Sequence, residues 1–214
     1  MILRYFGHSM FTLTLGSGKV ILTDPYGSFC RYSRHSLHAD VVTISHHHFD
    51  HDAMESVLGQ PPVFDEAGEY RPADGLLITG VQTFHDNHEG TRRGKNVVFV
   101  FETEGLRVVH MGDLGHVPGE AQLAAIGKPD ILLIPVGGTY TINAQRAFAC
   151  VELIRPRITV PMHYHTRFSA DLGIADETEF VQLMGERPDP VMELDITKDT
   201  AGSYPKLVLM DLQK

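Results

Sequence analysis

The sequence predicts an α+β protein in which β-sheets are covered by helices. Three observations lead to this fold class. The first half consists mostly of short runs rich in β-branched residues, the second half alternates helical and strand patterns, and 43% of the 214 residues are apolar, enough for a buried core. Because no internal repeat, low-complexity segment or linker divides the chain, we expect one domain over residues 1–214.

The predicted strands are apolar runs separated by turns that contain glycine or charged residues. Residues 10–16 and 19–25 flank Gly16-Ser17-Gly18, which predicts a hairpin. The continuous apolar run at 40–45 is typical of a strand buried on both faces. Further strands are expected at 75–84, 96–102, 106–111, 130–136, 157–162, 191–196 and 206–211.

Four segments have a helical pattern. A short helix is expected at 52–59, with Gly59 as its stop, and another at 119–127. Asn143 is a suitable N-cap for a helix over 144–155, which Pro156 ends. The segment 176–186 has an acidic first turn and apolar residues at helical spacing.

Composition and charge narrow the classes of partner. The net charge of −9 gives no general attraction to nucleic acid or to anionic membranes, and no apolar run is long enough to span a membrane. Cys30 and Cys150 do not form a disulfide framework, so we expect a cytoplasmic protein. The one basic patch, Arg92, Arg93 and Lys95, is expected to be a solvated loop, and a homo-oligomer is left open.

Histidine is in excess, and the chain places four histidines and two aspartates at positions 46–52, directly after an apolar strand. In extended backbone His46 and His48 point to the same side and can reach one metal ion, while His47 points away. Asp50 and His51 follow as the chain turns and can face a second ion. Imidazole and carboxylate ligands suit zinc, manganese and iron.

A helical zinc site is the alternative geometry, since His47 and His51 are four residues apart. That motif requires a glutamate directly after the first histidine, where this chain has His48. Further candidate ligands follow predicted strands, as a site along one sheet edge requires: His85, Asp113 and His163.

These motifs resemble those of the metallo-β-lactamase-fold hydrolase superfamily. HHHFDH (46–51) matches its H-x-H-x-D-H signature, while MGDLG (111–115) and VPMHY (160–164) are similar to its bridging-aspartate and last-histidine motifs. The segment 6–25 is similar to its opening hairpin. GHS and VPMHY resemble the branch that includes ascorbate-phosphate lactonase and related hydrolases.

The resemblance implies a four-layer αββα sandwich with two divalent metal ions at one edge of the paired sheets. The implied ligands of the first ion are His46, His48 and His85, and those of the second are Asp50, His51 and His163. Asp113 would bridge the two ions. Asp24 would orient ligands without binding the metal itself. His8 either packs beside the ligands in the same way or belongs to a capped turn.

Two questions about other histidines stay open at this stage. His110 is the rival of His85 as third ligand of the first ion, although it lies inside a predicted strand. His88, His116 and His165 flank candidate ligands and are either at the mouth of the site or ordinary loop residues.

The function expected is hydrolysis of an ester, lactone or phosphodiester of a small metabolite by a hydroxide bridging two metal ions, with Asp50 helping to move a proton. Zinc is the metal we expect, and manganese and iron accept the same ligands. The absence of a G-x-S-x-G motif argues against a serine hydrolase. The alternatives are a nuclease or phosphodiesterase acting on nucleic acid, which the negative charge disfavours, and a non-catalytic member of the fold.

Overall fold

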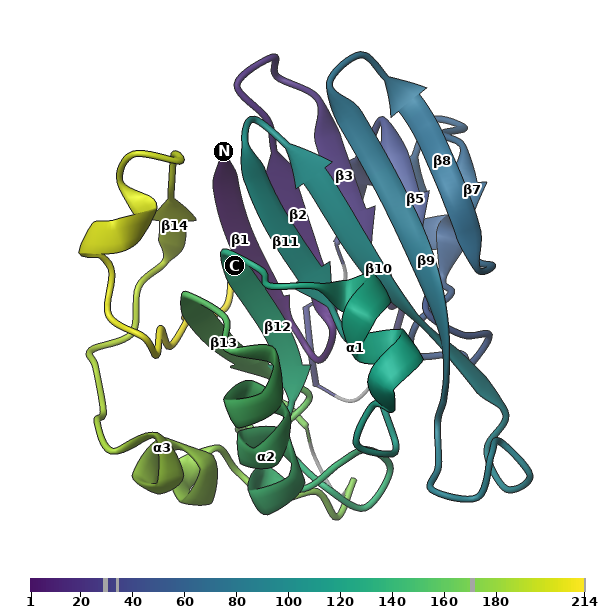
Figure 1. Cartoon of the computed structure of the whole chain (residues 1–214). Coiled ribbons are helices and arrows are strands. Elements are labelled where there is room, and N and C mark those ends of the chain that lie inside the picture. Colours follow the sequence, from purple (N-terminus) through teal and green to yellow (C-terminus); the bar gives the residue numbers. More distant parts are fainter. Residues whose placement is uncertain (29–30, 34, 170–171, 214) are drawn as a thin grey trace.

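Two six-stranded sheets pack face to face in the computed structural model, which describes residues 1–28, 31–33, 35–169 and 172–213 (Figure 1). Cys30 lies outside these residues. The first sheet has the strand order β14-β1-β2-β3-β5-β7. Its strands are β1 (Ile2–Gly7), β2 (Met10–Thr14), β3 (Val20–Thr23), β5 (Val41–Thr43), β7 (Val63–Phe64) and β14 (Glu193–Asp195).

The second sheet has the order β13-β12-β11-β10-β9-β8. Its strands are β8 (Gly68–Ala73), β9 (Leu76–Phe84), β10 (Lys95–Thr103), β11 (Leu106–His110), β12 (Ile131–Pro135) and β13 (Ile158–Met162). In β10 the side chains alternate between the two faces, and both faces are buried. Phe99 and Phe101 face the first sheet, whereas Val98 and Val100 pack beneath helices, which explains the continuous apolar run.

Strand direction brings many strand ends to the same edge. β1 and β3 are each antiparallel to β2, and β5 is parallel to β3. In the second sheet β9 and β11 are each antiparallel to β10, while β12 and β13 run parallel to β11. The carboxyl ends of β1, β3 and β5 therefore share one edge of the first sheet, and those of β9, β11, β12 and β13 share one edge of the second.

Helices cover the outer face of the second sheet (Figure 1). They are α1 (Glu120–Ile126), α2 (Ala144–Ile154) and α3 (Thr178–Met184). The Asn143 cap is confirmed, because its side chain accepts a hydrogen bond from the Arg146 backbone N–H at 3.1 Å. Cys150 is fully buried in this layer. None of the helices in the described segments has the length and apolar character needed to cross a membrane.

The outer face of the first sheet is covered without an α-helix in the described part of the chain. The helix expected at 52–59 is wrong: the chain forms one 3₁₀ turn, η1 (Met54–Ser56), and then β6 (Val57–Leu58), which pairs with β4 (Leu37–His38). A segment this short gains little from helical hydrogen bonds, and the β-branched Val57 pairs instead. Loops, η1 and these short strands thus replace one helical layer of the expected αββα sandwich.

Two further expectations differ from the structure. Residues 206–211 are extended but form only isolated bridges, Leu207 with Thr159 and Met210 with Val191, instead of a regular strand. Strands β1, β7 and β8 were not predicted; β8 is the exposed edge of its sheet and carries Pro72, which weakens its strand pattern. A second 3₁₀ turn, η2 (Ala201–Ser203), precedes the extended segment.

Candidate metal centre

Every predicted ligand lies just beyond the carboxyl end of a strand. Two backbone hydrogen bonds join the ends of the two sheets: the N–H of Val97 donates to the carbonyl of Ser45, and that of His163 to the carbonyl of His8, both at 2.8 Å. The strands that deliver the residues are β1 for His8, β3 for Asp24, β5 for residues 46–51, β9 for His85, β11 for Asp113 and β13 for His163.

The structure brings His46, His48 and His85 together as a first group. One ring nitrogen of each lies within 4.8 Å of the others. The rings of His46 and His48 are 4.5 Å apart, and those of His46 and His85 are 4.6 Å apart. His47 points away and contacts Asp52 and Asp65 at the surface. The alternation expected for 46–48 is therefore present, although β5 ends at Thr43 and these residues form a loop.

A second group of predicted residues lies around His51 and His163. One ring nitrogen of each of His8, His51 and His163 lies within 4.8 Å of the others, and Asp50 adjoins this cluster. The rings of His51 and His163 are stacked with centroids 5.9 Å apart. Asp50 Oδ2 lies 3.9 Å from His51 Nε2. His8 packs against His163 with ring centroids 4.0 Å apart, and its Nε2 lies 3.2 Å from Asp50 Oδ2. Because burial, aided by the charge of His163, lowers the pKa of His8 to about 3, a neutral His8 donates this hydrogen bond and orients the carboxylate.

Asp113 lies between the two groups. Its Oδ2 is 3.2 Å from His163 Nε2, 3.4 Å from His85 Nε2 and 3.9 Å from His46 Nε2. Its Oδ1 is 3.4 Å from His51 Nε2. Burial raises the pKa of Asp113, but the charges of His163 and His51 outweigh burial and hold the pKa well below its ordinary value. One ionised carboxylate thus faces histidines of both groups.

Asp24 is fully buried behind the histidines and uses both of its oxygens. Oδ1 accepts a hydrogen bond from the Ser45 N–H at 2.7 Å. Oδ2 accepts from Ser45 Oγ at 2.6 Å and from His51 Nδ1 at 2.9 Å. Ser45 Oγ in turn contacts His46 Nδ1 at 3.0 Å. Asp24 therefore contacts His51 directly and His46 through Ser45, a position from which it can orient one histidine of each group. One of its oxygens also lies within 4.8 Å of a ring nitrogen of His46 and of His51.

The MGDLG segment is shaped by close backbone contacts. A side chain on Gly112 would come within 2.4 Å of the Ser45 Cβ, and one on Gly115 within 2.2 Å of the Asp86 backbone nitrogen. Asn96, which the sequence did not single out, holds the backbone around Asp113 in place. Its Oδ1 accepts from the Asp113 N–H at 2.8 Å, and its amide nitrogen donates to the Met111 carbonyl at 3.0 Å.

Three residues of the site have left-handed backbone conformations. The φ angles are 55° at His8, 40° at Asp24 and 51° at His163. Such conformations are unfavourable for residues with a Cβ and persist where surrounding contacts fix them. Their concentration at one sheet edge is typical of a functional site.

His85, and not His110, reaches the first group. His110 is fully buried and uses both ring nitrogens elsewhere: Nε2 contacts the Ser9 carbonyl at 2.8 Å, and Nδ1 accepts from the Gly112 N–H at 3.3 Å. His116 is also held by backbone, because its Nε2 accepts from the Phe84 N–H at 3.2 Å. His88 and His165 are exposed loop residues.

Electrostatics favour a cation at this edge. Burial, reinforced by the charge of His51, lowers the pKa of His46 to about 2, and burial also lowers that of His85. Burial lowers the pKa of His51 as well, but Asp113 and Asp24 outweigh it and raise the pKa well above the ordinary value. His46 and His85 therefore present neutral imidazoles, and the aspartates next to His51 attract positive charge.

The residues present fit divalent metal ions. His46 Nε2, His51 Nε2 and Asp113 Oδ1 are buried and have no hydrogen-bond partner within the described ranges. Buried polar atoms are normally paired, and a place for a bound ion is one reason for an exception. The donors are imidazole nitrogens and carboxylate oxygens, which zinc accepts.

Comparison with known proteins gives the family. A family model for the beta-lactamase superfamily domain matches residues 2–163. The chain belongs to this superfamily. A UPF0173 metal-dependent hydrolase from Polaromonas sp. is 30% identical, the alignment covering 89% of this chain and 85% of that protein. One from Thermococcus onnurineus is 31% identical, covering 88% and 94%.

The superfamily assignment extends to solved structures. A protein from Thermotoga maritima, assigned to the Zn-dependent hydrolases of the metallo-beta-lactamase superfamily, superposes with a TM-score of 0.80 and 38% identity over 99% of both chains. The expected metallo-β-lactamase fold is confirmed, with loops in place of one helical layer.

Proposed function

We propose that the chain is a binuclear metal-dependent hydrolase of a small metabolite. The observation that carries the proposal is the position of Asp113, whose two oxygens lie 3.2–3.4 Å from His85, His163 and His51, members of both groups. His46, His48 and His85 would hold one ion, Asp50, His51 and His163 the other, and Asp113 would contact both. The relatives named metal-dependent hydrolases support the same assignment.

Zinc is the metal we propose, because imidazole nitrogen and carboxylate oxygen are its ordinary ligands, and manganese and iron are the alternatives. The Thermotoga maritima protein, assigned as Zn-dependent, agrees with this choice. When bound, a pair of such ions lowers the pKa of water toward neutrality, so that hydroxide is available to attack an ester, lactone or phosphodiester.

The chain's own residues would orient the ligands and move protons. Burial raises the pKa of Asp50, but the hydrogen bond from His8 and the charge of His51 outweigh burial and keep it below the ordinary value. Asp50 is therefore a carboxylate at neutral pH and is able to accept a proton from the attacking water. His8 would keep this carboxylate in place during the transfer.

The experiment combines metal analysis with a substrate panel. We expect about two equivalents of a divalent metal per chain, and metal-dependent turnover of at least one chromogenic ester, lactone or bis-phosphoester. His46→Ala and Asp113→Ala should lose metal and activity. His47→Ala is the matched control, because this neighbouring histidine is exposed and points away. Full metal content in the first two variants, or equal loss in all three, would contradict the ligand assignment.

A further inference from the structure

We propose that the substrate carries a phosphate group that binds Arg92, Arg93 and Arg146 beside the first histidine group. This inference deepens the proposed function and rests on it. The three arginines line a cavity of about 420 Å³ together with His85, the one predicted ligand among its lining residues. A group bound here would therefore lie to one side of the reacting centre.

The sequence predicts only a solvated loop for Arg92 and Arg93. In the structure this loop has a defined conformation. Asp86, directly after His85, accepts four backbone hydrogen bonds with its carboxylate. Oδ1 accepts from the N–H groups of His88 and Gly90 at 2.7 and 3.0 Å, and Oδ2 accepts from those of Arg92 and Arg93 at 2.9 and 2.7 Å. Desolvation raises the pKa of Asp86, but these four backbone hydrogen bonds outweigh it and hold the pKa below its ordinary value. Both arginines are thereby fixed relative to His85.

The guanidinium groups are available for a ligand. Arg93 is positioned over the Tyr140 ring at 4.8 Å and donates to the Thr139 carbonyl at 3.3 Å. Within residues 1–28, 31–33, 35–169 and 172–213, none of the three arginines forms an ion pair, whereas Arg107 and Arg187 do. The cavity is therefore lined by three guanidinium groups and one carboxylate, that of Asp86, whose oxygens are already occupied by the four backbone N–H groups.

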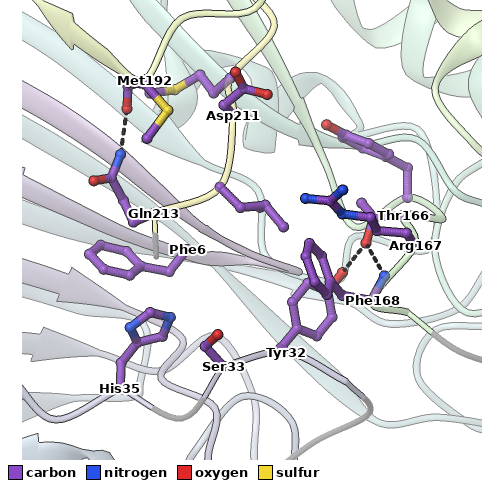
Figure 2. A pocket seen from close by; sticks show the side chains of 13 residues that line it. Phe6, Tyr32, Ser33, His35, Thr166, Arg167, Phe168, Met192, Asp211 and Gln213 are labelled. Atoms are coloured by element: carbon purple, nitrogen blue, oxygen red, sulfur yellow. Dashed lines mark hydrogen bonds between the residues drawn. The ribbon is translucent and has the colours of Figure 1, made fainter.

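The chemistry of the cavity favours a phosphate over a neutral or monoanionic group. Guanidinium groups donate paired hydrogen bonds to phosphate or carboxylate oxygens, and several of them match a dianion better than a monoanion. A second cavity, of about 550 Å³, has a different character (Figure 2). Phe6, Tyr32 and Phe168 line it together with Met192 and Met210, and it contains none of the predicted ligands.

Inorganic phosphate is the probe, titrated calorimetrically into metal-loaded protein at low ionic strength. Arg92→Gln/Arg93→Gln/Arg146→Gln should bind phosphate at least about tenfold more weakly than wild type. Arg71→Gln is the matched control, since Arg71 is exposed, has no ion pair in the described ranges and lines a different cavity. It should bind within about twofold of wild type, because it removes a charge of the same kind far from His85.

Every outcome of the titration either supports or overturns the proposal. Equal binding by the triple variant and wild type, or no saturable binding to wild type, overturns the proposal. So does tighter binding of acetate, which would indicate a carboxylate, or of a 12-mer oligonucleotide, which would indicate nucleic acid. If the triple variant does not fold, Arg92→Gln/Arg146→Gln preserves the Arg93 contact with Thr139 and serves instead. Metal content measured in parallel separates the two proposals. Wild type that holds no metal after loading refutes the binuclear hydrolase, and the same phosphate titration then compares the metal-free wild type with the metal-free arginine variant.

Discussion

Replacing Asp24 with asparagine tests whether one buried carboxylate sets the protonation of two of the proposed metal ligands, His46 and His51. An ionised carboxylate only accepts hydrogen bonds, so its 2.9 Å contact fixes the His51 proton on Nδ1 and leaves the Nε2 lone pair for a metal. Ser45 Oγ donates to the same oxygen and therefore accepts from His46 Nδ1, which frees His46 Nε2 in the same way.

Asparagine has the same shape as aspartate, but it changes which ring nitrogen of each histidine carries the proton. If its NH₂ group faced the Ser45 N–H, two donors would oppose each other, so NH₂ takes the Oδ2 position and donates to His51 Nδ1 and Ser45 Oγ. The protons of both histidines then move to Nε2. Restoring the metal-binding form means losing a buried hydrogen bond, about 1–3 kcal/mol, which corresponds to roughly 5- to 150-fold in metal affinity at each ion.

The assay is the zinc content of Asp24→Asn after equilibration with graded zinc buffers, alongside turnover of the best substrate. Asp52→Asn is the matched control, because it removes a carboxylate that lies 3.3 Å from His47, a surface histidine outside both groups. Circular dichroism establishes that both variants are folded. Asp24→Asn protein that binds zinc as tightly as wild type would refute the role given to this carboxylate.

Three further outcomes are expected. His85→Ala should lose the first metal, whereas His110→Gln should keep both metals and melt at a lower temperature. Elemental analysis measures the metal content and calorimetry the melting temperature. The opposite pattern would make His110, and not His85, the ligand of the first metal. In metal-free protein the raised pKa of His51 means that a proton must leave before Nε2 binds metal, so metal affinity, and the activity that depends on it, should fall as the pH decreases. Calorimetry in buffers of different ionisation enthalpy should detect this proton release, and a pH-independent metal affinity would exclude it. Asn96→Ala leaves the buried N–H of Asp113 unpaired and should reduce the free energy of unfolding by about 1–3 kcal/mol in denaturant titrations. An unchanged denaturation midpoint would show that Asn96 does not stabilise the Asp113 backbone.

The strands and their ends could be predicted from the sequence because the pattern of apolar and polar residues that marks them is local. Runs such as 96–102 are apolar on both faces, and a polar residue that follows such a run, such as His85 or His163, marks the sheet edge. Residues 52–59 gave the wrong prediction because their weak helical preference competes with the pairing of Val57 and Leu37. That pairing depends on tertiary structure, which a local pattern does not contain.

Other parts of the site depend on contacts between distant residues. Asn96 lies within a strand and has no local signature, but it supports Asp113 from 17 residues away. Arg146 belongs to helix α2 and looks like an ordinary surface residue, yet it shares a cavity with Arg92 and Arg93. The contact between His8 and Asp50 likewise requires that β1 and β5 end at the same edge.

The metal centre and the arginine cavity are supported by different parts of the fold. The strained backbone at Asp24 and His163 is held by hydrogen bonds between strand ends: the Asp24 N–H donates to the Thr43 carbonyl at 2.9 Å, and the His163 N–H to the His8 carbonyl at 2.8 Å. The arginine loop is held instead by the carboxylate of Asp86 and by backbone hydrogen bonds within the loop. If both proposals hold, changes in this loop would alter which substrate binds while the sheet edge keeps the proposed metal ligands in place, a division that would let one chemistry serve different substrates.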